Sequence, residues 1–252
     1  MFDDLWAYID GKQKMPFMSM VRDDEKATVI RQYVPTGIIT WISDAPVDVN
    51  TAVDIEKREG NDRMVLSYAV SDTDAGIGIT NVPDGYEMEI AETAVVYESE
   101  NTRRYDLHVD GASVRKADVS DVDILRASCN ADDVGGNIDY ASQFADAIEY
   151  GGDVYALEYK GDAASYLSLS RYTSERFGYD YLEPKMIYTI PCHRSRGFAS
   201  LILCSVMDMH AGKPFLYTVD SVDNDASCAL AESYGFERIG YNRMSVFYRP
   251  QK

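Results

Sequence analysis

The sequence lacks three things: an apolar run long enough to span a membrane, an excess of basic charge, and closely spaced metal ligands. It contains 24 Lys and Arg against 42 Asp and Glu, which gives a formal net charge of −18. Nucleic acids and anionic membranes are bound through basic surfaces, so we expect neither as a partner. The acidity suits a cationic substrate such as an amine, but the simpler interpretation is that it keeps a cytoplasmic protein soluble.

Cysteine and histidine are scarce and widely spaced. The 4 cysteines include no CxxC pair, and the 3 histidines show no ligand spacing. This pattern predicts reduced thiols in a cytoplasmic protein, and no metal. The acidic start of the chain, Met1-Phe-Asp-Asp-Leu-Trp, is not expected to be a signal peptide.

The first half of the chain carries no motif that we can attach to chemistry. Its patterns predict helices within residues 1–16, 23–33 and 50–58, and strands over 38–42, 64–70, 87–97 and 105–109. The Gly-x-Gly within residues 74–80 lacks a third glycine at the dinucleotide spacing and is interpreted as a loop. The polar residues 98–104 are interpreted as a linker. We therefore predict two domains, 1–110 with an α+β fold and unknown role, and 111–252.

The apolar pattern in the second half of the sequence predicts an alternation of strands and helices. Strands are expected over residues 114–117, 154–159, 164–177, 186–190, 215–219, 236–241 and 244–248. Helices are expected over 118–129, 137–150, 198–210 and 224–234. Lys160-Gly161-Asp162 predicts a tight hairpin turn. This order is typical of a mixed sheet with helices on both faces.

The most informative stretch begins with residues 186–190, which are apolar and β-branched and predict a buried strand. Pro191 ends that strand because it lacks a backbone donor. From Phe198 the apolar residues follow helical spacing, and Gly197 lies immediately before them. The first N–H groups of a helix have no partner within it and carry partial positive charge. A strand, a glycine turn and a helix start therefore predict an anion-binding site.

This order of elements, together with two motifs, resembles the GNAT superfamily of acyl-CoA-dependent N-acyltransferases. The first motif of the family is Gln or Arg, two residues, Gly, one residue, then Gly or Ala, and it is matched by Arg194-Ser195-Arg196-Gly197-Phe198-Ala199. The second is an Asn-led helix that ends in Gly-Phe, and residues 224–236 match it. The resemblance covers residues 113–250. It implies a mixed, mostly antiparallel GNAT-type sheet flanked by helices, preceded by the smaller α+β domain.

The resemblance implies acetyl-CoA as co-substrate. The strand over residues 186–190 is expected to splay from the strand over 215–219, so that the pantetheine arm lies between them. The pyrophosphate is expected on the backbone N–H groups of Ser195, Arg196, Gly197, Phe198 and Ala199, with charge supplied by Arg194 or Arg196.

Further binding roles fall on the preceding strand and on the second motif. A backbone N–H of Tyr188, Thr189 or Ile190 is expected to hold the oxyanion. Asn224 is expected to cap its helix, and in family members this residue often faces the CoA.

Two catalytic roles follow from the same resemblance. Glu183 stands 11 residues before Arg194, the offset of the glutamate base in the histone acetyltransferase branch, although it also fits a solvated residue before Pro184. The tyrosine acid that many members use is replaced here by Ala231. Tyr234, 3 residues later, is the nearest substitute, and it also fits a packing residue.

Three functional hypotheses result. The first is an N-acetyltransferase that moves acetyl from acetyl-CoA to a primary amine of a small molecule or a peptide by direct attack. The second is an acyl-CoA-binding sensor that has lost its chemistry, which Ala231 favours. The third adds a protein-interaction or dimerisation role for residues 1–110, which leaves a homodimer open. The sequence does not identify the acceptor.

Overall fold

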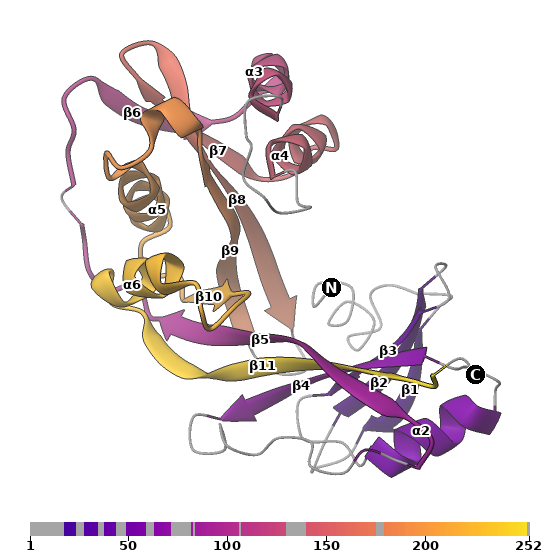
Figure 1. The fold of residues 1–252 in the computed structure, drawn as a ribbon. Helices are drawn as coiled ribbons and strands as arrows, with labels where there is room; N and C mark the ends of the chain where they lie inside the picture. Colours follow the sequence, from indigo (N-terminus) through magenta and orange to yellow (C-terminus); the bar gives the residue numbers. More distant parts are fainter. Residues whose placement is uncertain are drawn as a thin grey trace.

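The structure, a computed structural model, describes residues 18–23, 28–34, 38–43, 49–58, 63–71, 82, 84–105, 107–129, 140–174 and 179–250. The helix expected within residues 1–16 and the loop expected within 74–80 lie outside these residues. The described strands form one 11-stranded sheet in the order β1-β2-β3-β4-β11-β5-β10-β9-β8-β7-β6. Figure 1 shows this sheet running through the whole molecule, with β5 and β11 extending from one half into the other.

The first half contributes five strands and one helix to the description. They are β1 (Met18–Asp23), β2 (Thr28–Val34), β3 (Ile38–Ser43), α2 (Val49–Arg58), β4 (Arg63–Ser71) and β5 (Glu87–Ser99). The helix over 50–58 and the strands over 38–42, 64–70 and 87–97 are thereby confirmed. The helix within 23–33 is wrong, because β2 pairs antiparallel with both β1 and β3. Its β-branched Thr28, Val29 and Ile30 suit a strand with neighbours on both sides.

The second half alternates as expected. Its elements are β6 (Ala112–Lys116), α3 (Val119–Cys129), α4 (Tyr140–Glu149), β7 (Val154–Tyr159), β8 (Asp162–Ser174), β9 (Tyr179–Thr189), a short 3-10 helix (Pro191–His193), α5 (Phe198–Met209), β10 (Phe215–Val219), α6 (Asp225–Ser233) and β11 (Glu237–Tyr248). Helices α3 and α4 cover one face of β7, β8 and β9, and α5 covers the other (Figure 1). Among the described strands, only the pairs β3–β4 and β9–β10 are parallel. The mixed, mostly antiparallel fold class is confirmed.

Two expectations for this half need correction. The two strands predicted over residues 236–241 and 244–248 are one continuous strand, β11, which pairs along its length with β5 and over most of it with β4. The polar Asn242 continues the strand because partners on both sides satisfy its backbone. Residues 105 and 107–109, expected as a strand, have no strand structure.

One strand from the first half of the chain, β5, lies among the strands of the second half. Strand β5, which precedes residue 110, lies between β10 and β11 and is antiparallel to both. The sheet is therefore continuous across the boundary predicted at residues 110 and 111. The boundary itself stays a prediction.

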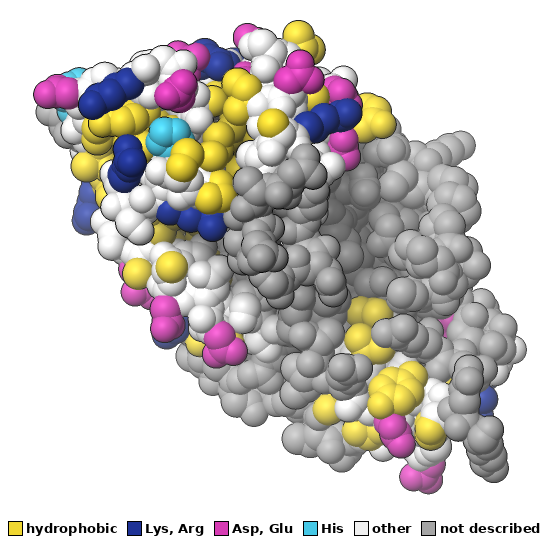
Figure 2. All heavy atoms as spheres, turned by 45° about the horizontal axis from the view of Figure 1, so that its top comes forward, with side chains coloured by type: hydrophobic (Ala, Val, Ile, Leu, Met, Phe, Trp, Pro, Cys, Tyr) yellow, Lys and Arg dark blue, Asp and Glu magenta, His cyan; other side chains and the backbone are white. Residues whose placement is uncertain are grey.

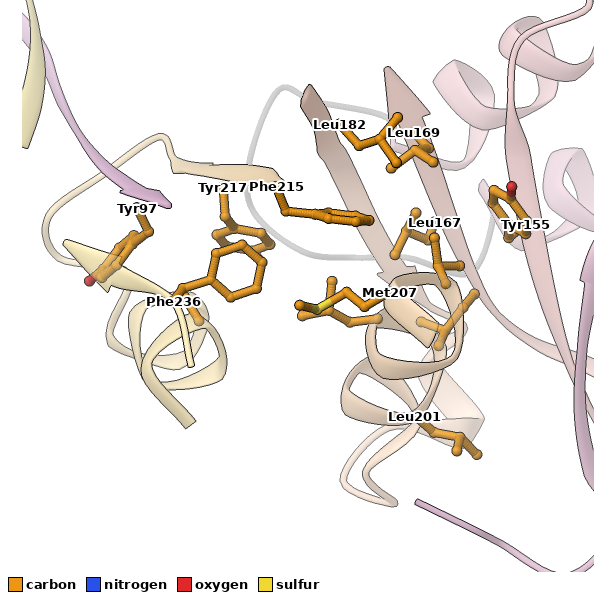
Figure 3. Close-up of a cluster of buried hydrophobic side chains, with 14 of the residues drawn as sticks. Tyr97, Tyr155, Leu167, Leu169, Leu182, Leu201, Met207, Phe215, Tyr217 and Phe236 are labelled. Carbon is orange, nitrogen blue, oxygen red and sulfur yellow. The ribbon is translucent and has the colours of Figure 1, made fainter. Parts of the chain in front are cut away.

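The largest apolar cluster lies between α5 and the strands β5, β7, β8, β9 and β10. Figure 3 shows Leu167, Leu169 and Leu182 grouped beside Met207 of α5, with Phe215 pointing toward them from β10. A second cluster fills the opposite face beneath α3 and α4. Both faces of this part of the sheet are covered by packed side chains. This close packing fixes the positions of β9 and α5, which carry the site.

Within the described residues, no helix is both long enough and apolar enough to cross a membrane. Three cysteines whose side chains are described, Cys192, Cys204 and Cys228, are free thiols, as expected.

Candidate active site

Strands β9 and β10 separate almost as soon as they meet. Their pairing is confined to Leu182 and Phe215, where the Leu182 N–H donates to the carbonyl of Pro214 at 2.9 Å. Beyond this point a cavity of about 300 Å³ opens between the two strands and the start of α6. Its lining includes Lys185, Ile187, Ala199, Thr218, Asn224 and Ser227. The splay predicted from the sequence is present, and it leaves the β9 backbone facing a gap instead of a neighbouring strand.

The start of α5 contributes Ala199, in the first turn of the helix, to the lining of this cavity. The N-cap residue is Gly197, with φ of 76°, and no side chain hydrogen-bonds to the first turn as a cap. Ser195 also has a positive φ, of 60°. A Cβ placed on Gly197 would meet nothing within 4 Å, so the helix start is open to a ligand. The buried Phe198 side chain belongs to the core, which leaves its backbone N–H as its contribution to an anion site.

The two arginines of the turn are exposed and fold back onto the protein. The Arg194 Nε donates to the carbonyl of Thr189 at 3.1 Å, and its guanidinium lies 6.0 Å from the ring centre of Tyr188. Arg196 makes one long contact, 3.4 Å, with the carbonyl of Cys192 and lies 5.9 Å from the Tyr159 ring centre. Both therefore place positive charge beside the open helix start.

His193 precedes this turn and packs its ring against Tyr159 and Phe198. Its Nδ1 is buried and makes no hydrogen bond. Figure 2 shows a face of the molecule on which Lys and Arg side chains lie near a histidine and a group of hydrophobic side chains, with Asp and Glu side chains among them. The positive charge next to the turn comes from Arg194 and Arg196.

Asn224 forms the N-cap of α6 as expected. Its side-chain oxygen accepts a hydrogen bond from the Ser227 N–H at 3.1 Å. The same residue lines the cavity. The structure therefore confirms the capping and places Asn224 at the cavity wall.

Glu183 is a buried residue of β9, and the alternative of a solvated position before Pro184 is wrong. Strand β9 begins at Tyr179, and its pairing with β8 shifts register at Pro184, so that Lys185 forms a bulge. A proline is tolerated at such a point because the ladder is already interrupted. The Glu183 carboxylate accepts hydrogen bonds from the Lys185 ammonium at 2.7 Å and from the Thr218 hydroxyl at 2.7 Å.

A second carboxyl lies close to this pair. Asp220 follows β10 and lines the cavity. Asp220 is exposed, and partial desolvation of its carboxyl raises the pKa of Asp220, while the Lys185 charge lowers it and the Glu183 charge raises it. The Lys185 ammonium pairs with Glu183, and Asp220 is the carboxyl on the cavity wall.

Tyr234 lies away from the cavity. It is the C-cap residue of α6, its carbonyl accepts a hydrogen bond from the Tyr105 hydroxyl, and the two rings meet edge to face at 5.4 Å. It is not among the residues that line the cavity. Ala231, at the position of the family's tyrosine, is fully buried. The acid role of Tyr234 stays a prediction that this arrangement does not support.

The strand positions predicted for the oxyanion site lie beyond the cavity. Tyr188 is buried against Phe144, and Thr189 and Ile190 bond toward β8 through Ser165 and Ala164. Met186 and Ile187, which come directly after the bulge, line the cavity instead. The Ile190 N–H donates to Ala164 of β8, and N–H groups alternate along a strand, so the Met186 N–H points toward β8 and the Ile187 N–H points away from it, toward the splay.

Sequence reasoning missed a pair of hydroxyls on the cavity wall. The Tyr217 hydroxyl and the Ser227 hydroxyl lie 2.9 Å apart, and both residues line the cavity. Burial raises the pKa of Tyr217, so its proton is retained at neutral pH. The signal for this pair in the sequence was weak. Ser227 stands 3 residues after Asn224 on the same helix face, and Tyr217 alternates with half-buried neighbours in β10.

No protein-family model and no curated protein sequence matches the chain. Solved structures do match it. A tandem GNAT protein from the clavulanic acid biosynthesis pathway matches with a TM-score of 0.60 and 12% identity, covering 99% of this chain and 88% of that one. A GCN5-related N-acetyltransferase from Kribbella flavida matches with a TM-score of 0.56 and 12% identity, covering 98% and 96%. The chain has the GNAT fold.

The fold likeness extends further than the two motifs. The GNAT resemblance in sequence covers residues 113–250, whereas the structural matches run over nearly the whole chain. A functionally unknown conserved protein from Staphylococcus epidermidis also matches, with a TM-score of 0.57, 12% identity and coverage of 92% and 94%. At these identities the likeness concerns the fold alone.

The candidate site is therefore the splay between β9 and β10, where Ala199 of the first turn of α5 and Asn224, the N-cap of α6, line one cavity. Among the described residues, no group of three or more His, Cys, Asp or Glu is arranged to hold a metal ion.

Proposed function

We propose that this chain is an N-acyltransferase that moves an acyl group from acyl-CoA, most simply acetyl-CoA, to a primary amine. The observation that carries this proposal is the cavity in the splay. Ala199 in the first turn of α5 lines it, and two other lining residues, Lys185 and Thr218, hydrogen-bond the buried Glu183. A thioester held there supplies an activated carbonyl.

Glu183 is the general base in this proposal. An amine must lose a proton before its lone pair can attack a thioester carbonyl, and a carboxylate is a suitable acceptor. The Thr218 hydroxyl occupies Oε1 and the Lys185 ammonium occupies Oε2, which together hold the carboxylate in one orientation. The amine replaces Lys185 at Oε2 or reaches it through a water.

The backbone at the β9 bulge holds the oxyanion. In this proposal the Ile187 N–H, which points away from β8 at the cavity wall, donates a hydrogen bond to the developing negative charge. On the opposite wall, the Tyr217 and Ser227 hydroxyls are the nearest proton donors for the departing thiolate. They offer an alternative to the acid role predicted for Tyr234.

The acceptor is a cationic amine in this proposal. Asp220 lines the cavity, the buried Glu183 lies behind Lys185, and the ring of Tyr172 lies 5.0 Å from the Lys185 ammonium. Carboxylates and an aromatic face are the groups that attract an ammonium ion.

The test is acetyl-CoA binding by isothermal titration calorimetry, followed by thiol release with a panel of primary amines. We expect binding in the micromolar range and turnover that Glu183→Gln lowers about 100-fold with binding retained. Absence of binding to the folded wild-type chain contradicts the proposal.

A second candidate function is an acyl-CoA sensor without chemistry. The buried Ala231 and the remote Tyr234 favour it, because the family's usual acid is missing from the cavity. Binding without turnover across the panel, together with slow thiol release that Glu183→Gln leaves unchanged, establishes the sensor over the enzyme.

A further inference from the structure

Lys185 occupies the position that the proposal above assigns to the acceptor amine. It lines the cavity in the splay, and its ammonium donates to Glu183 Oε2 at 2.7 Å. The ammonium also lies 5.0 Å from the ring centre of Tyr172, which restricts where it can move. Because Lys185 is the extra residue of the β9 bulge, its backbone is adjacent to the N–H groups of Met186 and Ile187.

We propose that Lys185 is an acceptor within the same chain, so that the protein acylates its own Lys185 when acyl-CoA is bound. This inference rests on the proposed function, because it uses the same base and the same cavity. A lysine already held beside the base has lost much of the translational freedom that a separate amine must give up.

The step balances without any further reactant. Glu183 takes one proton from the Lys185 ammonium, and the amine lone pair then forms a C–N bond to the thioester carbonyl. The C–S bond breaks, and the departing thiolate takes the second proton that the amine loses. Glu183 releases the first proton to solvent and is again a carboxylate, and the products are Nε-acyl-lysine, CoA with a free thiol, and one proton.

Acylation removes the charge from Lys185 and therefore removes its ion pair with Glu183. Oε2 of the carboxylate becomes available to a second amine, while the Thr218 hydroxyl continues to hold Oε1. The positive charge that lowers the pKa of Asp220 also disappears. A cationic acceptor then meets two carboxyls with no resident cation between them. Self-acylation thus prepares the site for an external amine.

A simple structural ion pair is the competing explanation, and Lys213 is a matched control for it. The Lys213 ammonium also pairs with a carboxylate, that of Asp180, at 2.5 Å, but it does not line the cavity. Its side chain is 44% exposed, against 29% for Lys185, and that of Lys116 is 69% exposed. Uncatalysed acetylation by acetyl-CoA follows exposure and modifies Lys116 and Lys213 before Lys185.

The experiment incubates the full chain with acetyl-CoA and no added amine, and follows each lysine by peptide mass spectrometry. We expect Lys185 to be labelled at least about tenfold faster than Lys213, with a rate per molecule that does not depend on protein concentration. Glu183→Gln is expected to slow labelling at Lys185 about 100-fold and to leave Lys213 and Lys116 unchanged. Lys185→Arg is expected to abolish the site while retaining the ion pair.

Three outcomes overturn the inference, and they are distinguishable. If acetyl-CoA binds and external amines are acetylated while Lys185 stays unmodified, self-acylation is wrong and the proposed function stands. If acetyl-CoA does not bind to the folded chain, both fail together. The inference is also overturned if Lys185 is labelled more slowly than the more exposed Lys213 and Lys116, and if Glu183→Gln does not change its rate. Circular dichroism of Glu183→Gln confirms that the variant is folded.

Discussion

Helices α5 and α6 both contribute residues of their first turns to the wall of the same cavity, but their N-termini are capped differently. Helix α6 begins at Asn224, whose side chain accepts a hydrogen bond from the Ser227 N–H. Helix α5 begins at Gly197, which has no side chain to cap it. One helix satisfies its own first turn, and the other leaves its N–H groups to solvent or to a ligand.

The difference has a physical consequence for where an anion binds. Both helices carry partial positive charge at their starts, but the donors of α6 are already in part used. At α5 the donors are open, Gly197 leaves room for close approach, and Arg194 and Arg196 stand next to it. The α5 start is therefore the end of the cavity at which we expect the diphosphate of acyl-CoA.

The largest expected effect is the loss of acetyl-CoA binding in Gly197→Glu. A carboxylate at the open start repels the diphosphate, and a non-glycine residue at φ of 76° is strained by about 1–2 kcal/mol. Calorimetry is expected to show a loss of affinity of at least about 100-fold.

The matched control for this change is Gly212→Glu, just beyond the other end of α5. Gly212 has φ of 80°, and a Cβ there also meets nothing within 4 Å. The Gly212→Glu substitution introduces the same backbone strain and the same charge, but away from the site. We therefore expect a similar loss of stability, and an acetyl-CoA affinity within about threefold of wild type. Equal losses of affinity in both variants contradict a specific role for the α5 start.

A moderate effect is expected for Asn224→Ala. Removing the cap of α6 leaves a donor of its first turn unsatisfied and is expected to lower the free energy of unfolding by about 1 kcal/mol, measured in urea. Acetyl-CoA affinity is expected to fall less than tenfold, because the diphosphate lies at the other helix. Asn224→Asp keeps an acceptor oxygen and is expected to restore stability. Abolished binding at unchanged stability assigns Asn224 to the ligand and removes the contrast between the helices.

The smallest effects are expected for Arg194→Gln and Arg196→Gln. Both side chains are exposed, so each charge is screened by solvent, and we expect affinity losses of about two- to fivefold. Titrations at rising salt concentration are expected to weaken binding to the wild type more than binding to the double variant. A double variant with wild-type affinity and wild-type salt dependence shows that the backbone alone supplies the site.

Local patterns in the sequence were sufficient to predict much of the second half. The turn at Lys160 and Gly161, with φ of 55° and 92°, and the capped start at Asn224 depend on neighbouring residues alone. The helix start after Gly197 is of the same kind. Residues 23–33 were predicted wrongly because their mixed apolar and charged pattern fits either period, and pairing with β1 and β3 decided for strands.

The setting of Glu183 depends on residues far along the chain. Its hydrogen bond to Thr218 spans 35 residues and exists only because β10 returns beside β9. The bulge at Lys185 depends on register with β8, which no local pattern specifies. The Tyr217 and Ser227 pair likewise requires α6 to pack over β10.

By itself the sequence determined the glycine turn before α5, the capped start of α6 and the resemblance to GNAT enzymes, because these depend on the types of residues that are close together in the chain. The tertiary structure decided that β5 lies between β10 and β11, that β9 and β10 part after a single pair, and that Lys185 rests on Glu183. Such features depend on which strands pair with each other and on which side chains are buried against each other. Both depend on contacts between distant parts of the chain, which exist only when the whole sheet has formed.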